Sequence, residues 1–587
     1  MLNSAALTIA TTGKAGAKTR QTAVETLAVI VGAICLFGQL GALGLVGPDE
    51  PRYAWIARAM AETGDWITPK LYGLPWFEKP VLYYWLAGIG FKLGFSAEWA
   101  ARLPSALAAL GAAIAIAWMA QRYFVRKAAI REPNSTLPIF AAVVFATSVA
   151  GIGFARAATP DMLFSASITA AMAFAATLLP IAPDAATQIN GTIASAQESS
   201  ISPLVAQICF GAFLGLGVLA KGPAAVILAG GAIAIWAALT KNWRAAFRLA
   251  SPAAIFVFCV VSLPWYVLCA ARNPDFLHVF IFQHNFERYL TPVFQHIQPF
   301  WFFVPVALAA LIPWLAFLAP SVGDAYEAIQ RKTWLTSPAL YFACWALFPI
   351  LFFSISKSKL PSYILPGVPA LALLATVSAE RTFERSRRGA AVLAGLLGLT
   401  WAGLVLAAVL RFEKLPPYIL QNFNLSAIRI VAAALAVVIA SLLVITGGKQ
   451  KFTWLVALNA ILVAITVEAV NIRVLPLVDP FVSARVPGTF AAQNANERFF
   501  TYKLARAWNY GIAFYAHGEL PEWTPENQYS GVAFTTQAGY TELHQLGRFH
   551  GRLDRINMGV IWVPVYGAAP ADGSTDSPVQ GPLDQKR

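Results

Sequence analysis

The sequence predicts a mostly helical membrane protein that crosses the bilayer many times and ends in a small α/β unit. Of its 587 residues, 58% are hydrophobic and 12% are charged, which is about half of the charged fraction usual in soluble domains. The mean hydropathy is +0.60. Apolar segments follow one another along the chain, each near the roughly 20 residues that a spanning helix needs. After about residue 472 the composition changes, which predicts a separate final unit.

About thirteen apolar segments are predicted to span the membrane. The first is too long for the apolar core of a signal peptide, so we expect it to be retained as a helix. Residues 1–22 then form a cytoplasmic tail, and residues 23–472 form the transmembrane domain. The approximate spans are 23–46, 100–121, 138–156, 163–183, 204–220, 223–240, 249–271, 300–319, 337–355, 363–378, 389–410, 430–446 and 453–471.

Basic residues sort the loops between these spans into two sets. Lysine and arginine gather in alternate loops, which we expect to face the cytoplasm. One loop of this set, about 184–203, is rich in Ala, Ser and Thr and contains neither residue. The net charge of +14 is spread over these short loops and forms no single basic stripe, so it argues against nucleic acid as a partner. The opposite loops, which contain nearly every unusual polar motif, are expected outside.

The first long outer loop, about 47–99, begins with an acid at the start of a predicted helix. Tyr53, Ile56, Ala57 and Met60 recur at helical spacing, which predicts an amphipathic helix lying on the membrane. Asp49 precedes them. It is either an ordinary residue at a helix N-terminus or a catalytic carboxylate, and the local sequence weighs these alternatives evenly.

The same loop places Glu78 and Lys79 side by side among aromatic residues and before Pro80. The proline keeps Lys79 extended. An interfacial aromatic belt with a snorkelling lysine explains this pattern slightly better than a functional role does, when the motif is taken alone.

A second acid, Asp161, lies in the very short loop between the third and fourth spans. It must therefore lie at the membrane surface. A helix N-terminus with Thr159 as its cap would also explain the acid. Two acids on the same face are more informative than either alone, because a carboxylate pair can orient a polar acceptor or take a proton.

Several cations lie in outer loops, against the positive-inside pattern. Lys221, Lys357 and Lys359 are examples, and a lipid phosphate is their natural partner. Nonspecific binding to phospholipid head groups is the alternative. The loop after the seventh span contains His284, which with Glu78 could hold a divalent ion if the fold joins them, although two ligands are too few to define a site.

The final stretch is predicted to contain short strands. Residues 532–534 and 560–563 are β-branched or aromatic runs between turn signals, which is typical of strands in a small α/β domain. We expect this domain to cover residues 473–566. Residues 567–587 are rich in Ala, Pro, Asp, Ser and Gly and are predicted to be disordered.

Taken together, the motifs resemble a known group of enzymes over most of the chain. The group comprises the lipid A 4-amino-4-deoxy-L-arabinose transferases and relatives within the C-type polyprenyl-phosphate-dependent glycosyltransferases, related to protein mannosyltransferases. The matching segments are Asp49-Glu50-Pro51-Arg52-Tyr53, Phe77-Glu78-Lys79-Pro80, Trp99-Ala100-Ala101-Arg102-Leu103-Pro104-Ser105, Thr159-Pro160-Asp161, Lys221-Gly222-Pro223 and Phe353-Ser354-Ile355-Ser356-Lys357-Ser358-Lys359-Leu360-Pro361.

The resemblance implies about thirteen transmembrane helices, juxtamembrane helices on the periplasmic face and a C-terminal periplasmic domain, in a bacterial inner membrane. It implies an undecaprenyl-phosphate sugar as donor and lipid A or another periplasmic glycolipid as acceptor. Asp49 and Asp161 look like the catalytic acids, and Glu78 and His284 resemble groups that contact a divalent metal ion, with Asn285 as an alternative to His284. The residues that look like contacts of the carrier phosphate are Arg52, Lys79, Lys221, Arg288, Lys359 and Tyr363.

A flippase or other transporter of lipid-linked sugars is the main alternative. Transporters tend to place ionisable residues at mid-membrane depth. The centres of the predicted spans are nearly free of charge, so the sequence favours an enzyme that works at the outer face.

Overall fold

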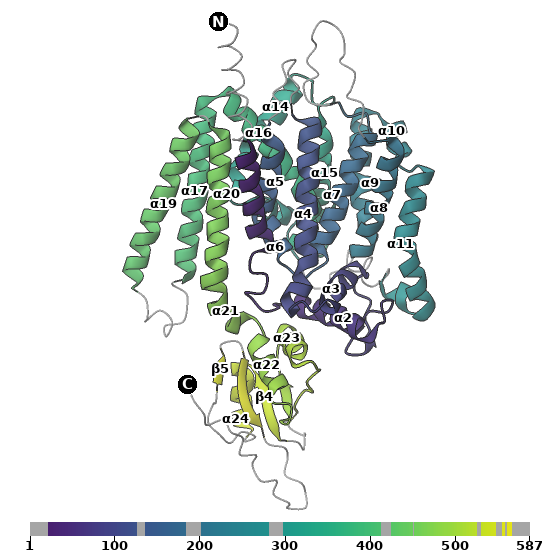
Figure 1. The fold of residues 1–587 in the computed structure, drawn as a ribbon, viewed down its shortest axis with the longest axis vertical. Coiled ribbons are helices and arrows are strands. Elements are labelled where there is room, and N and C mark those ends of the chain that lie inside the picture. The colour runs from purple at the N-terminus through teal and green to yellow at the C-terminus, as the bar shows by residue number, and fades with distance from the viewer. Residues whose placement is uncertain are drawn as a thin grey trace, which may run out of the picture.

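The computed structural model describes residues 21–125, 135–182, 201–280, 297–412, 424–449, 451–524, 530–546, 555–557 and 560–565. Long helices run side by side in one bundle, and a small sheet with its own helices lies beyond one end of it (Figure 1). The described N-terminal helix lies within the bundle, and the last strands lie in the sheet. The chain is therefore mostly helical, as predicted.

Among the described residues, nine helices are long and apolar enough to cross a membrane. Two further pairs of helices are bent, which brings the number of candidate spans to as many as eleven. The nine are α4 (Ala97–Tyr123), α7 (Asp161–Leu178), α8 (Pro203–Lys221), α11 (Pro252–Arg272), α15 (Pro338–Ile355), η4 with α16 (Pro361–Arg385), α17 (Arg387–Phe412), α19 (Leu425–Gly448), and α20 with η5 and α21 (Phe452–Val482). The protein therefore has many membrane spans, and the number thirteen stays a prediction.

Two bent pairs replace straight spans of the prediction. Helix α5 (Leu137–Ala146) meets α6 (Val149–Ala155) at 61°, and residues 300–310 (η2 and α13) meet residues 314–330 (η3 and α14) at 108°. At the first break, the hydroxyl of Ser148 accepts the backbone N–H of Gly151 at 3.1 Å and so begins a new helix. The two remaining predicted spans coincide with shorter apolar helices, residues 21–37 and α9 (Ala224–Thr240).

The first predicted span, 23–46, is wrong beyond residue 37. The helix ends at Phe37, and an irregular segment with glycines at 38, 41 and 44 follows. Its carbonyl groups are bound by arginine side chains instead of helical N–H groups. Arg102 donates to the oxygens of Leu40 at 2.7 Å and Leu43 at 2.6 Å, and Arg156 donates to that of Gly38 at 2.6 Å.

At the end of the bundle nearest the sheet, short elements form a layer that caps the spans (Figure 1). They are α2 (Asp49–Thr63), β1 (Lys70–Leu71), β2 (Leu74–Pro75) and α3 (Leu82–Lys92). Helix α2 is the amphipathic helix that the sequence predicts, and its four predicted apolar residues are all buried. The short α10 (Trp243–Arg248) lies at the opposite end of the bundle.

The residues after α21 form a four-stranded mixed sheet with three helices. The strand order is β3-β4-β6-β5, in which β3 and β4 are parallel and the other pairs are antiparallel. The predicted runs 532–534 and 560–563 lie in β4 and β6; the boundaries 473–566 stay a prediction, and residues 567–587 lie outside the described residues. The elements are α22 (Arg485–Gln493), β3 (Phe499–Tyr502), α23 (Arg506–Ala516), β4 (Gly531–Thr535), α24 (Gln537–Gln545), β5 (Arg555–Asn557) and β6 (Val560–Val565).

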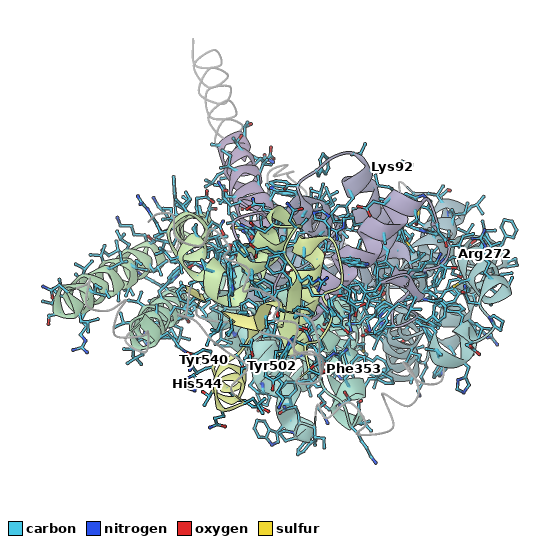
Figure 2. The ribbon with its side chains drawn as sticks, turned by 90° about the horizontal axis from the view of Figure 1, so that it is seen from below. Lys92, Arg272, Phe353, Tyr502, Tyr540 and His544 are labelled. Carbon is cyan, nitrogen blue, oxygen red and sulfur yellow. The ribbon has the colours of Figure 1, made fainter. Side chains whose placement is uncertain are left out.

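Polar contacts fix this C-terminal unit to the bundle. The hydroxyl of Tyr515 on α23 donates to Glu98 on α4 at 2.7 Å, and Arg485 on α22 pairs with the same carboxylate at 3.2 Å. Asp479 on α21 accepts the N–H of Gly44 at 2.6 Å. Seen from below, Tyr502 and Tyr540 of this unit lie well apart from Arg272 at the end of α11 (Figure 2), so the unit leaves the α11 side of the layer uncovered.

A buried ion pair joins the capping layer to the spans. Glu50 on α2 and Arg102 on α4 are 6% and 4% exposed, and Glu50 Oε2 lies 2.7 Å from Arg102 Nη2. Glu50 also accepts the N–H groups of Val46 at 2.9 Å and Ala158 at 2.7 Å. One carboxylate therefore holds α2, α4, the segment after residue 37 and the loop before α7 together.

Replacing Glu50 by glutamine should strongly destabilise the protein. The change leaves the charge of Arg102 buried without its acid, for which the cost is about 3–5 kcal/mol. Thermal unfolding of the purified protein in detergent should show a markedly lower midpoint. Glu62→Gln is the matched control, because Glu62 lies on the same helix, is 65% exposed and pairs with Arg58 at 3.8 Å. Equal midpoints for both variants would contradict the structural role of Glu50.

Candidate active site

Asp49 is the first residue of α2, and its carboxylate is engaged by a side chain. Pro48 is the capping residue and no side chain caps the helix, so the interpretation of Asp49 as a simple cap does not hold here. Oδ1 of Asp49 instead accepts from Nη2 of Arg52 at 2.5 Å. With 53% of its side chain exposed, Asp49 remains open to a molecule that approaches from outside the bundle.

Arg52 lies one turn further along α2 and is buried between acids and aromatic rings. Its Nη2 is 2.9 Å from Oε2 of Glu78. Its guanidinium carbon lies 5.2 Å, 5.4 Å and 5.6 Å from the ring centroids of Tyr53, Trp76 and Tyr510, distances typical of cation–π contacts. Burial by itself would lower the pKa of Arg52, but the charges of Glu78 and Asp49 outweigh it and raise the pKa. Arg52 is therefore a permanent cation.

Glu78 and Lys79 point to each other in the turn before α3. Lys79 Nζ lies 3.2 Å from Glu78 Oε1, and the two side chains are 14% and 12% exposed. A snorkelling lysine would extend its ammonium group into water, so the belt interpretation does not describe Lys79 in this fold. The two oxygens of Glu78 therefore face two different cations, Arg52 and Lys79.

Asp161 begins α7 and forms an ion pair with Lys221 at the end of α8. Their side chains are 16% and 18% exposed, and Lys79 and Ser362 also interact with Asp161. No side chain caps α7, and the hydroxyl of Thr159 has no partner among the described residues, so the predicted cap is wrong. The ammonium group of Lys221 lies 5.4 Å from the ring centroid of Tyr363 in η4.

These contacts join into one series of alternating charges, which we call the charge chain. Ion pairs join Asp49, Arg52, Glu78 and Lys79 in one run and Asp161 and Lys221 in a second. The charge of Lys79 acts on Asp161 and so relates the two runs. Three carboxylates alternate with three cations, so the series is neutral. It connects α2, the turn before α3, α7 and α8, which lie far apart in the sequence but meet at one end of the spans.

Of the other predicted contacts of the carrier phosphate, Lys359 has partners outside the charge chain and Tyr363 adjoins it. Lys359 is 6% exposed, and its Nζ donates to the carbonyl oxygens of Ser356 at 2.5 Å and Gln298 at 3.0 Å. Tyr363 joins the charge chain through Lys221. Arg288, His284 and Asn285 lie outside the described residues, so the metal hypothesis for Glu78 and His284 stays a prediction.

The structure adds two residues that sequence reasoning did not propose for the site. Tyr510 comes from the C-terminal unit and packs against Arg52; nothing in its local sequence indicates a contact so remote along the chain. Ser362 interacts with Asp161. Its position between the matched segment, which ends at Pro361, and the predicted phosphate contact Tyr363 is the signal that could have identified it.

A pocket of about 490 Å³ lies beside Glu78. Its volume is within the range of pockets that hold small molecules. Aromatic residues of the first outer loop form one wall, and residues after α11 form the other. The lining residues are Pro75, Trp76, Phe77, Glu78, Arg272, Asn273, Pro274, Asp275 and Val279.

Comparisons with known proteins relate the whole arrangement to one family. Residues 27–280 match the family described as Dolichyl-phosphate-mannose-protein mannosyltransferase. The undecaprenyl phosphate-alpha-4-amino-4-deoxy-L-arabinose arabinosyl transferase of Serratia proteamaculans (strain 568) is 31% identical over 421 residues, which cover 70% of this chain and 69% of that protein. The proteins of the same name from Edwardsiella ictaluri and Erwinia tasmaniensis are 30% and 31% identical, and the matches cover 61% and 56% of this chain and span 61% and 54% of their lengths.

The fold is shared with solved structures. The crystal structure of ArnT from Cupriavidus metallidurans bound to undecaprenyl phosphate superposes with a TM-score of 0.73 at 23% identity, covering 92% of this chain and 98% of that chain. The apo state gives 0.70 at 22% identity with the same coverage. The resemblance noted from the sequence motifs is thus confirmed, and the chain belongs to the family of the undecaprenyl phosphate-α-4-amino-4-deoxy-L-arabinose arabinosyl transferases.

Proposed function

We propose that the protein is an integral-membrane glycosyltransferase that moves a sugar from undecaprenyl phosphate to lipid A or another periplasmic glycolipid. The sugar is 4-amino-4-deoxy-L-arabinose or another pentose or hexose. The charge chain carries the proposal, because it offers cations for a lipid phosphate and carboxylates for an acceptor at the same place. The names of the family members and the carrier bound to the ArnT structure support the same donor.

The cations of the charge chain are proposed to hold the carrier phosphate. Arg52, Lys79 and Lys221 each have a carboxylate as partner, and a phosphate can take the place of that carboxylate with stronger charge-assisted hydrogen bonds. During transfer, the bond from the anomeric carbon to the phosphate oxygen breaks and its electron pair stays on the phosphate. Cations already in position stabilise the charge that develops there.

The acids are proposed to act on the acceptor. An acceptor hydroxyl oxygen forms the new bond to the anomeric carbon, and its proton passes to Asp49 or Asp161. Asp49 is the more exposed of the two. Its carboxylate loses its partner and becomes free when Arg52 binds the phosphate instead. If the acceptor oxygen already belongs to a phosphate, no proton has to be removed, and the acids then position the substrates.

We further propose thirteen transmembrane helices, with the charge chain and the domain 473–566 on the periplasmic side of a bacterial inner membrane. The distribution of lysine and arginine among the loops supports this orientation. The shorter apolar helices, residues 21–37 and α9, would add two spans to the eleven that are long enough or form bent pairs.

A flippase for lipid-linked sugars is the alternative. It would need ionisable groups along a path through the membrane. Asp161 lies at the first residue of α7 and Lys221 at the last residue of α8, so this charged pair lies at the ends of spans. That position favours chemistry at the surface over passage through the bilayer.

Transfer from radiolabelled polyprenyl-phosphate sugars to extracted membrane lipids tests the proposal directly. In proteoliposomes, the intact protein should form labelled lipid, and Asp49→Asn should lower the rate by about 10²- to 10⁴-fold, as expected when a proton acceptor is lost. Glu62→Gln is the control on the same helix. Absence of product with every donor, together with movement of the carrier across the bilayer, would instead support the flippase.

Removing single cations should weaken use of the donor more than it weakens folding. Lys79→Met and Lys221→Met each delete a contact proposed for the phosphate, and a charged hydrogen bond of this kind contributes about 1.5–3 kcal/mol, or roughly 10- to 150-fold in kcat/KM for the donor. Initial rates at varied donor concentration measure the effect. If the loss of activity only follows the loss of folded protein, the lysines are structural.

The orientation can be tested with single cysteines in a background without the native ones. Leu74 begins β2 and is 71% exposed, so Leu74→Cys should react with a membrane-impermeant maleimide in intact spheroplasts. Lys332→Cys, at an exposed position after α14, should react only after permeabilisation. The reverse pattern would place the charge chain on the cytoplasmic side.

A further inference from the structure

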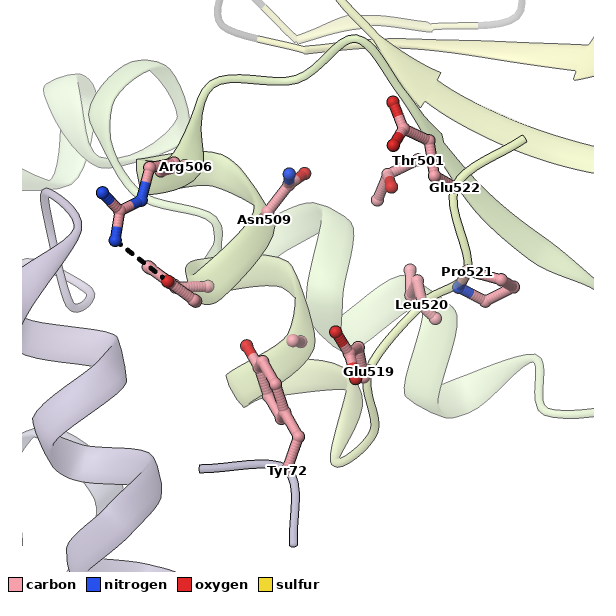
Figure 3. A pocket seen from close by; sticks show the side chains of 10 residues that line it. Tyr72, Thr501, Arg506, Asn509, Glu519, Leu520, Pro521 and Glu522 are labelled. Carbon is pink, nitrogen blue, oxygen red and sulfur yellow. Dashed lines mark hydrogen bonds between the residues drawn. The ribbon is translucent and has the colours of Figure 1, made fainter. Parts of the chain in front are cut away.

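A second pocket, of about 430 Å³, lies where the C-terminal unit meets the first outer loop (Figure 3). Tyr72, from the turn between β1 and β2, supplies one wall. Residues of β3, α23 and the segment 519–522 supply the rest. We call it the interdomain pocket. It is separate from the pocket beside Glu78, and no residue of the charge chain lines it.

The backbone fixes the outer wall of this pocket. The N–H of Thr501 in β3 donates to the carbonyl oxygen of Pro521 at 3.0 Å, and the N–H of Trp523 donates to that of Thr501 at 2.8 Å. Trp523 is 1% exposed and anchors the segment in the C-terminal unit. Glu522, between these bonds, is thereby held at the rim.

The polar groups of the pocket have unused hydrogen-bonding capacity. Glu519 and Glu522 form no hydrogen bond or ion pair with other described residues, and the buried Oδ1 of Asn509 likewise accepts no hydrogen bond from them. Glu519 and Glu522 are exposed, whereas a buried polar atom such as Oδ1 of Asn509 is rarely left unpaired. A ligand that donates several hydrogen bonds would satisfy all three groups.

The balance of charge selects among ligands. Two carboxylates line the pocket against one guanidinium, that of Arg506, which donates to the hydroxyl of Tyr510 at 3.2 Å (Figure 3). An anionic group such as a phosphate would therefore be repelled. Hydroxyl and ammonium groups are donors that suit carboxylate and amide oxygens.

Aromatic surfaces complete the pocket. The rings of Tyr72 and Tyr510 lie 6.3 Å apart at an angle of 33°, and both line the cavity. A sugar ring carries an apolar C–H face and a rim of hydroxyl groups, so it can lie on a tyrosine while its rim meets Glu519, Glu522 and Asn509. We propose that the interdomain pocket binds a neutral or amino sugar ring of the acceptor; this inference rests on the proposed function.

The position of Tyr510 explains why the acceptor, and not the donor, is the proposed occupant. One tyrosine lines the pocket and also packs on Arg52 at 5.6 Å. A sugar in the pocket is thus separated from the charge chain by a single ring. The donor phosphate needs the cations of the charge chain, and none of Arg52, Lys79 and Lys221 lines the interdomain pocket.

Kinetics of the full-length protein in proteoliposomes test the assignment. Glu522→Gln combined with Asn509→Ala should raise the KM for the acceptor about tenfold or more, as expected for the loss of roughly 1.4 kcal/mol, while the KM for the donor changes less than about twofold. Glu542→Gln is the control, because Glu542 is an exposed acid of the same unit that pairs with Lys503 at 2.7 Å. A raised donor KM, or no change in either constant, would overturn the proposal.

Direct binding separates a failure of this inference from a failure of the proposed function. Saturation-transfer NMR of the purified full-length protein, without donor, should detect a glucosamine disaccharide but not glucuronic acid. The double variant should lose the signal and Glu542→Gln should keep it, whether or not the protein transfers sugar. An equal signal from the double variant would overturn the proposal. Sugar transfer without detectable binding of the disaccharide would also overturn it, but the proposed transferase function would still hold.

Discussion

The buried ion pair between Glu50 and Arg102 determines where both acids of the candidate site lie. Glu50 adjoins Asp49 in the sequence, and its Oε1 accepts the N–H of Ala158, three residues before Asp161. Arg102 at the same time binds the carbonyl groups of the segment that leads into α2. Breaking a buried ion pair leaves an uncompensated charge out of water, which is strongly destabilising. The start of α2 and the start of α7 are therefore fixed to each other by an interaction that neither partner can leave.

The same physical rule organises the charge chain, but with a different consequence. Its members are partly buried, so each cation has an acid beside it, and the alternation leaves no net charge. A phosphate that binds to these cations competes with the carboxylates already paired to them. Under the proposed function, this competition weakens the pairing of Asp49 and favours its carboxylate as a proton acceptor when the donor is present. Glu50 differs because it is held by backbone N–H groups as well as Arg102, so it stays structural.

The sequence was informative wherever a property is local. Apolar length identified the long apolar helices, and helical spacing identified the buried face of α2. It was less informative where distant segments meet. The first span was extended past Phe37 because the glycines beyond it are compatible with apolar helix, and the carbonyl groups there are satisfied by Arg102 and Arg156, which no local pattern indicates. The bends at residues 147–148 and 311–313 likewise depend on packing.

Among site residues, local motifs identified the members of the charge chain but not their pairing. Asp49 and Asp161 looked like helix caps because acids are common at helix starts, and only the fold shows that their carboxylates face Arg52 and Lys221. Nothing in the sequence near Glu78 indicates that its two oxygens face Arg52 and Lys79. Such pairings depend on tertiary structure, and a local motif does not show which distant residue its side chain will contact.

Arg52 is the point at which the C-terminal unit can influence chemistry at the membrane. Its guanidinium group is 5% exposed and is surrounded by rings from α2, the first outer loop and α23. Aromatic faces attract a cation without taking up its hydrogen-bonding groups, so Arg52 keeps its N–H groups for carboxylate or phosphate. One of the three rings belongs to Tyr510 on α23, the same helix whose Tyr515 donates a hydrogen bond to Glu98 on α4. The contacts of Glu98 with Tyr515 and Arg485 hold the C-terminal unit against the bundle, and the same attachment keeps the ring of Tyr510 beside Arg52.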